Sequence, residues 1–119
     1  MAGLNFWCDS IQKDTICFVN TLIRTEAFVA WLNTVRDRVA LARILQRLDA
    51  AVIGQFGDCE PVGDGISEMR IHVGAGYRVY FTRRGAFVYL LFCGGAKASQ
   101  ARDIKRAKQM LKFLDKESS

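Results

Sequence analysis

The fold is decided by residues 67–95, which read SEMRIHVGAGYRVYFTRRGAFVYLLFCGG. Three runs in this stretch, residues 67–73, 77–82 and 86–93, have the alternation or the apolar content of β-strands. The first two runs alternate between apolar and polar residues. The third is almost wholly apolar, as expected for a central strand that is covered on both sides. Glycine-containing turns at 74–76 and 83–85 separate the runs, and Gly94 and Gly95 are expected to end the third, so a three-stranded antiparallel meander is predicted.

Upstream of the meander, the sequence predicts one strand and two helices. Residues 15–24 (TICFVNTLIR) are rich in β-branched and apolar side chains, which favour a strand. Thr25 can cap a short helix with one buried face, and Asp37 can start a longer one that ends at Gly54. The expected apolar stripe of the longer helix is Val39, Ala42, Leu45, Leu48 and Val52.

The remaining segments complete an α+β domain. Residues 56–65 (FGDCEPVGDG) have the composition of a loop, and residues 99–114 have the periodicity of a last helix. The expected order is β-α-α-β-β-β-α, with a mostly antiparallel sheet packed on a helical hairpin. Residues 1–14 show no clear period and are expected to form an irregular or loosely attached extension.

Composition restricts the class of protein. The chain has 119 residues, enough for one domain, and no apolar run approaches the ~20 residues that span a bilayer. Its first 18 residues lack the features of a secretory signal, so a cytoplasmic protein without membrane contact is expected. The four cysteines form no Cys-x-x-Cys pair and there is a single histidine, so neither a zinc site nor a disulfide framework is predicted.

Positive charge is concentrated in the second half of the chain. The formal net charge is +5, and residues 69–112 contain ten basic residues against one acidic residue, Asp103. A segment with charge of one sign attracts polyanions such as nucleic acid, although a solvated surface without a partner would look the same.

Several linked motifs resemble the RelE/ParE toxin superfamily, and within it the HigB-like branch of addiction-module killer proteins. That branch carries FGDxxPVGxGxxExRI, then GPGYRVYF, then GGxKxxQxxDI. The matching residues here are Phe56-Gly57-Asp58, Pro61-Val62-Gly63, Glu68, Arg70-Ile71, Gly76 to Phe81, Gly94-Gly95, Lys97, Gln100 and Asp103-Ile104. The resemblance covers roughly residues 19–114. It implies that residues 1–18 are an N-terminal extension and that residues 19–119 form the toxin domain, with Ala75 where the family commonly has proline.

The resemblance implies a fold, an activity and partners. RelE-like folds have a twisted antiparallel sheet beside two N-terminal helices. The toxin is held inactive in a hetero-oligomer with a cognate antitoxin, often of helix-turn-helix type. RelE and HigB toxins are endoribonucleases that cut mRNA on the ribosome without a metal or other cofactor. Two alternatives stay open: a ParE-like inhibitor of DNA gyrase that is not an enzyme, and an inactive phage or plasmid remnant that only binds its antitoxin.

Four basic residues are the candidate catalytic groups. Arg78 is the strongest candidate, because it corresponds to an arginine that faces the substrate phosphate in RelE-like toxins; the alternative is a sheet arginine paired with Glu68. Arg70 and His72 fall near two RelE lysines; His72 could act as general base or acid, or make one structural hydrogen bond. Arg70 could bind phosphate or pair with an acid. Lys97 approximates a RelE residue that contacts the leaving phosphate, behind two glycines that either approach a ligand or form a turn.

Five more residues are candidates for binding RNA. Tyr77 and Tyr80 could stack on a base, although a core role is expected for at least one of them. Arg43 and Arg47 on the second helix, and Lys105 on the last, are expected to contact ribosomal RNA or an acidic antitoxin through salt-sensitive interactions.

Overall fold

The computed structural model describes residues 19–118, so residues 15–18 of the first predicted strand, and the predicted extension, lie outside the described residues. The order of elements is β1 (Thr21–Arg24), α2 (Glu26–Leu32), α3 (Arg38–Val52), β2 (Cys59–Gly63), β3 (Ile66–Ile71), β4 (Tyr77–Arg83), β5 (Val88–Ala96), the 3₁₀ turn η1 (Lys97–Ser99) and α4 (Gln100–Ser118). The α+β class is confirmed, with a five-stranded sheet in the order β1-β5-β4-β3-β2. All neighbouring strands are antiparallel except β1, which runs parallel to β5.

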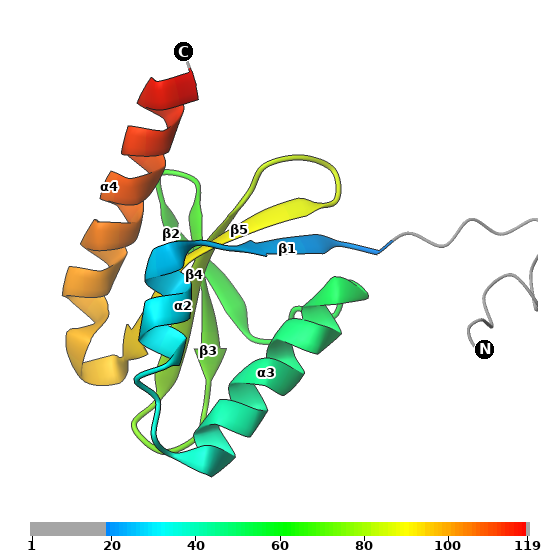
Figure 1. The fold of residues 1–119 in the computed structure, drawn as a ribbon, viewed down its shortest axis with the longest axis vertical. Helices are drawn as coiled ribbons and strands as arrows, with labels where there is room; N and C mark the ends of the chain where they lie inside the picture. Colours follow the sequence, from blue (N-terminus) through cyan, green and yellow to red (C-terminus); the bar gives the residue numbers. More distant parts are fainter. Residues whose placement is uncertain (1–18, 119) are drawn as a thin grey trace, which may run out of the picture.

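Helices cover both faces of the sheet (Figure 1). On one face α2 lies against β5, and α3 lies against β1 and β3; on the other, α4 crosses β5, β4 and β3. The predicted side-chain caps are present: Thr25 Oγ1 accepts from the amide of Phe28, and Asp37 Oδ1 accepts from the amides of Val39 and Ala40. The side chains of Thr25 and Asp37 therefore start these two helices where the sequence predicted them.

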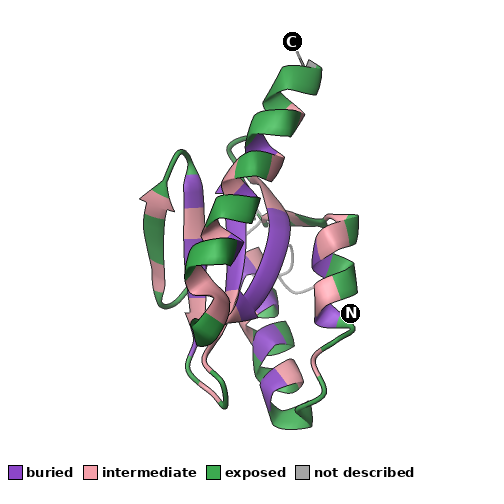
Figure 2. Cartoon of the chain, turned by 90° about the vertical axis from the view of Figure 1, so that its left-hand side faces the viewer, coloured by how far each residue is buried: buried purple, intermediate pink, exposed green. Residues whose placement is uncertain are grey.

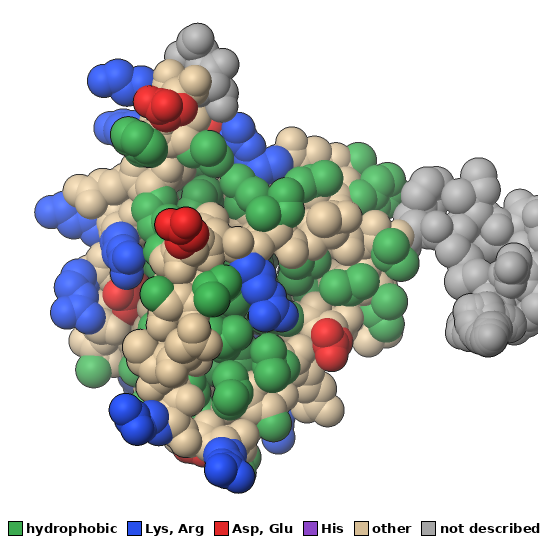
Figure 3. All heavy atoms as spheres, in the orientation of Figure 1, with side chains coloured by type: hydrophobic (Ala, Val, Ile, Leu, Met, Phe, Trp, Pro, Cys, Tyr) green, Lys and Arg blue, Asp and Glu red, His purple; other side chains and the backbone are tan. Residues whose placement is uncertain are grey.

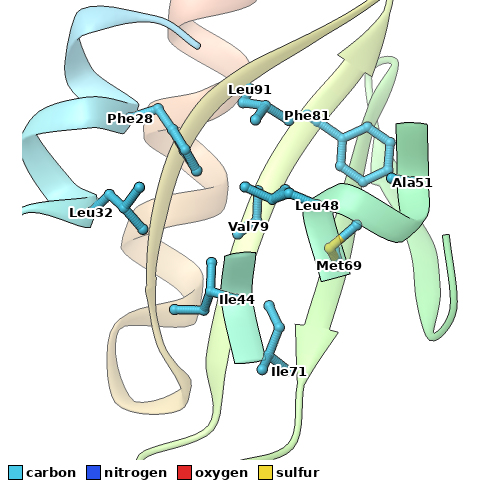
Figure 4. Packing of buried hydrophobic residues seen from close by; sticks show 10 residues of the cluster. All are labelled: Phe28, Leu32, Ile44, Leu48, Ala51, Met69, Ile71, Val79, Phe81 and Leu91. Atoms are coloured by element: carbon cyan, nitrogen blue, oxygen red, sulfur yellow. The ribbon is translucent and has the colours of Figure 1, made fainter. Parts of the chain in front are cut away.

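Two apolar clusters form the core, one on each face of the sheet. The cluster under α2 and α3 is drawn in Figure 4 and consists of Phe28, Leu32, Ile44, Leu48, Ala51, Met69, Ile71, Val79, Phe81 and Leu91. The cluster under α4 consists of Ile66, Tyr80, Phe92, Cys93, Ala107 and Leu111. Figure 2 shows that buried residues gather on the central strands and on the inner sides of the helices.

The segment predicted as a loop contains a strand. Cys59–Gly63 pairs with β3 as an edge strand, with an irregularity between Pro61 and Gly63. Its proline and glycine made a strand improbable, but an edge strand tolerates them because one side of its backbone needs no partner. The tight turn after it uses positive φ at Gly63, Asp64 and Gly65.

Three other element predictions were wrong in detail. The buried residues of α3 are Ala40, Ile44, Leu48 and Ala51, so the stripe is rotated by about one residue from the one predicted, and Val39 is 65% exposed. Gly94 and Gly95 lie inside β5 and do not end it. The last helix continues to Ser118 instead of ending at Leu114.

Candidate functional site

Strand register brings the four candidate catalytic residues to one end of the sheet. Arg70 lies opposite Arg78 across β3 and β4, and Arg78 lies opposite Gly95 across β4 and β5. His72 follows the last residue of β3, and Lys97 begins η1, where its amide donates to the carbonyl of Ala75 (3.3 Å). We refer to Arg70, His72, Arg78 and Lys97 as the sheet-end cluster.

Glu68 lies fully buried beside this cluster. Its Oε1 accepts from Nε of Arg70 (3.0 Å), and its Oε2 accepts from the hydroxyl of Tyr80 (2.9 Å) and from Nε2 of Gln100 (2.9 Å). Burial raises the pKa of Glu68, but the hydrogen bonds from Arg70, Gln100 and Tyr80, and the charge of Arg78, outweigh it. The pKa of Glu68 is therefore lowered from 4.5, and its carboxylate is ionised at neutral pH.

Arg78 forms an ion pair with Glu68, which is the alternative role that the sequence allowed for it, but the two groups are not within hydrogen-bond distance. Its Nε lies 3.6 Å from Oε2 of Glu68, and 12% of its side chain is exposed. Its Nε and Nη1 are buried and have no hydrogen-bond partner among residues 19–118.

Arg70 is bound by two carboxylates. In addition to the bond from its Nε to Glu68, its Nη2 donates to Oε2 of Glu60 (2.6 Å). These two hydrogen bonds, with Glu68 the stronger, raise the pKa of Arg70. Of the two roles that the sequence left open for Arg70, pairing with an acid is therefore the one that the structure contains.

His72 is the most exposed of the paired residues in the sheet-end cluster. Its Nε2 lies 2.5 Å from Oδ2 of Asp58, and 72% of its side chain is exposed. The hydrogen bond to His72 is the main cause of the lowered pKa of Asp58. The carboxylate therefore orients an imidazole ring that solvent and ligands can reach, an arrangement typical of a general base or acid.

The two glycines before Lys97 make room for side chains of the protein itself. A Cβ on Gly94 would overlap the indole of Trp31, and a Cβ on Gly95 would overlap the carboxylate of Asp103. These glycines were expected to approach a ligand or to form a turn. Instead, they allow Trp31 and Asp103 to pack against the backbone of β5. Lys97 is exposed, and no ion pair holds it within the described part of the chain.

The candidate RNA-binding residues have different environments. Tyr80 is 0% exposed, so it has the core role that was expected for at least one of the two tyrosines, and the expectation that it stacks on a base is corrected. Its hydroxyl donates to Glu68. Tyr77 lies on the opposite face, with its ring 6.5 Å from that of Trp31. Arg47 donates to the backbone carbonyls of Arg70 (2.5 Å) and Phe56 (2.8 Å), so its guanidinium joins α3 to the sheet.

Arg43 and Lys105 are exposed, as a contact role requires. Lys105 lines a groove of about 740 Å³ between α4 and the turn after β2, together with Lys108 and Lys112. Asp64 and Asp115 also line this groove, and Asp64 lies 3.7 Å from Nζ of Lys108. Figure 3 shows lysine and arginine side chains along the flank formed by α4.

Sequence reasoning did not identify Asp58 and Gln100 as members of the site, and it considered Glu68 only as a partner for Arg78. Strand alternation contains part of the signal that indicates Glu68, because it places Glu68 on the same face of β3 as Arg70. Among residues 19–118, no group of three or more histidine, cysteine or acidic side chains is arranged to hold a metal ion, and no helix is long and apolar enough to cross a membrane.

Comparison with known proteins identifies a relative of this chain. The chain is 41% identical over 90 residues to an uncharacterized protein of Haemophilus influenzae, an alignment that covers 76% of this chain and 91% of the relative. No family model matches the chain, and no solved structure matches it. The chain belongs to the same family as that Haemophilus protein.

Proposed function

We propose that this protein is the toxin of a type II toxin–antitoxin pair with a RelE-like fold of the HigB branch, and that it stops translation by cutting mRNA on the ribosome. The observation that carries the proposal is the sheet-end cluster, which brings Arg70 of β3, Arg78 of β4, His72 just after β3 and Lys97 just after β5 to the same end of the sheet. The net charge of +5 and the lysines of α4 support a polyanionic partner.

The chemistry of RNA cleavage suggests a role for three residues of the sheet-end cluster. When a ribose 2′-hydroxyl attacks the adjacent phosphate, a base takes the hydroxyl proton, an acid protonates the leaving oxygen, and positive charge stabilises the phosphate. His72 is suited to be the base, because a proton on Nε2 directed at Asp58 leaves Nδ1 as the acceptor. Lys97 and Arg78 supply positive charge near the phosphate. The ribosome supplies substrate geometry, and a cognate antitoxin of helix-turn-helix type is the proposed partner in the cytoplasm.

The proposal is tested by inducing the protein alone in bacteria and measuring the incorporation of labelled amino acids and of labelled thymidine. Amino-acid incorporation should fall first, and His72→Ala should abolish this effect at equal protein level. Arg24→Ala is the matched control, because it removes one positive charge from an exposed site on the edge strand β1. Continued translation after induction of the unaltered protein would contradict the proposal.

A ParE-like gyrase inhibitor is the second candidate, and one observation favours it. Arg70 and Arg78 each lie within ion-pair distance of the Glu68 carboxylate, so much of the positive charge of the sheet-end cluster is already balanced. An inhibitor that only binds needs no free phosphate-binding groups. Its signature would be stalled gyrase and DNA damage while protein synthesis continues, and absence of any growth arrest would indicate a remnant that only binds antitoxin.

A further inference from the structure

Arg78 is held by charge and not by a hydrogen bond. The 3.6 Å between its Nε and Oε2 of Glu68 is within ion-pair range but too long for a hydrogen bond. Its Nε and Nη1 are out of solvent and donate to no atom of residues 19–118. Buried donors without acceptors are unfavourable, so the guanidinium gains hydrogen bonds if it turns outward to an anionic oxygen.

Glu68, in contrast, already has several donors. Its Oε2, the oxygen that faces Arg78, accepts from Tyr80 on β4 and from Gln100 at the start of α4. Because these two hydrogen bonds come from different elements, they fix the direction of the carboxylate. They also leave Oε2 little capacity to accept a third hydrogen bond from Arg78.

We propose that Glu68 is the resident counterion of Arg78, and that an incoming phosphate group replaces Glu68 as the partner of the Arg78 guanidinium. Tyr80 and Gln100 then determine how readily Arg78 is released, because they occupy Oε2. The identity of the phosphate as that of an RNA backbone rests on the proposed function, but the competition between Glu68 and phosphate does not depend on the ribosome.

The proposal predicts opposite effects for two variants. Glu68→Gln removes the competing negative charge, so phosphate should bind more tightly. Tyr80→Phe keeps the buried ring but removes one donor from Oε2, which becomes free to accept from Nε of Arg78, so phosphate should bind more weakly. If Glu68 and Tyr80 served stability alone, both variants would change phosphate binding in the same direction or not at all.

The experiment is a titration of the full-length protein with inorganic phosphate and, separately, with a short single-stranded RNA. Binding is monitored through the ¹⁵N resonance of Arg78 Nε. That resonance is identified by its loss in Arg78→Lys. For both ligands, Kd should decrease in Glu68→Gln and increase in Tyr80→Phe, each by about threefold to tenfold, the range expected for one hydrogen bond. Thr82→Val is the matched control. Thr82 lies on β4 like Tyr80, and its hydroxyl donates a hydrogen bond to the carbonyl of Gly65, so the variant removes a hydroxyl hydrogen bond that does not involve Glu68.

The outcomes separate the competition from the proposed function. Kd changes of the same sign in both variants, or an unchanged Kd in Tyr80→Phe relative to Thr82→Val, would overturn the competition. The comparison of Tyr80→Phe with Thr82→Val tests the competition between Glu68 and phosphate even if Glu68→Gln does not fold. Predicted changes for inorganic phosphate without binding of free RNA would support the counterion role of Glu68, and the ribosome-dependent cleavage assay would then decide the proposed function separately.

Discussion

At Gly95 the backbone of β5 meets a side chain of α4. The Asp103 carboxylate occupies the space that a Cβ on Gly95 would need, and its Oδ2 accepts from Oγ of Ser99 (2.5 Å). Gln100, from the same helical turn, reaches Glu68. The Gly-Gly-x-Lys-x-x-Gln-x-x-Asp pattern therefore contains residues that fix the start of α4 to the sheet, in addition to the exposed Lys97.

Gly95→Ala is expected to lower the free energy of unfolding by about 1–3 kcal/mol, because the added methyl group forces Asp103 to move within a packed interior. Gly85→Ala is the control, since its Cβ would meet only Val88 at 3.9 Å, an ordinary contact. Urea denaturation of both variants checks the expectation, and equal midpoints would show that Asp103 moves without cost.

The hydrogen-bonded pair of His72 and Asp58 leads to a second prediction for single residues. His72→Ala should reduce mRNA cleavage by about 10²–10⁴-fold if the imidazole is the general base. Asp58→Asn should reduce it less, because the ring stays present but loses its orienting carboxylate. Both side chains are substantially exposed, so thermal unfolding should be nearly unchanged. Full cleavage by both variants would remove His72 from the site.

At the scale of elements, one arginine of α3 adds hydrogen bonds to the apolar packing that holds this helix against the sheet. Arg47 reaches the carbonyl of Phe56 before β2 and that of Arg70 in β3. The same arginine also restricts Gly57, where an added Cβ would lie 2.8 Å from its Nη2. Arg47 was predicted to contact RNA, and the sequence could not reveal this alternative because its carbonyl partners are 9 and 23 residues away.

Arg47→Ala should therefore destabilise the protein by about 2 kcal/mol or more, since it leaves part-buried carbonyls without charged donors. Arg43→Ala, one turn earlier on the same helix and exposed, should change stability by less than about 0.5 kcal/mol. Denaturant unfolding of the pair distinguishes these roles. If Arg47→Ala is as stable as Arg43→Ala, the hydrogen bonds of Arg47 contribute nothing to stability.

Elements with a strong local pattern could be predicted from the sequence, and those set by distant partners could not. The alternation in β3 and β4 and the side-chain caps Thr25 and Asp37 are local signals, and they were interpreted correctly. The strand β2 depends on pairing with β3, and the passage of β5 through Gly94 and Gly95 depends on Trp31 and Asp103. The pairing of His72 with Asp58 joins residues 14 positions apart, which no local pattern specifies.

At the scale of the whole molecule, both faces of the sheet carry an apolar cluster, and the face under α4 also carries the Glu68 network, beneath the start of that helix. Because Glu68 is buried and ionised, its hydrogen bonds couple global stability to pH.

The pKa of Glu68 is lower in the folded protein than its ordinary value of 4.5, so its contribution to stability is complete above that pH. The contribution is lost as the pH falls below 4.5 towards the folded-state pKa. The free energy of unfolding should therefore decrease more steeply below pH 4.5 in the unaltered protein than in Glu68→Gln. Urea denaturation between pH 3 and pH 7 measures both curves, and parallel curves would show that Glu68 is not linked to folding.

The activity that we propose for this protein is the cutting of mRNA in a way that depends on the ribosome. Its most direct test is to incubate purified protein with a defined mRNA, with and without assembled ribosomes, and to map the new 5′ ends. New ends are expected within the coding sequence only when ribosomes are present, and none are expected with His72→Ala. If the mRNA stayed intact on the ribosome although the same protein arrested bacterial growth, the proposed mRNA cleavage would be contradicted.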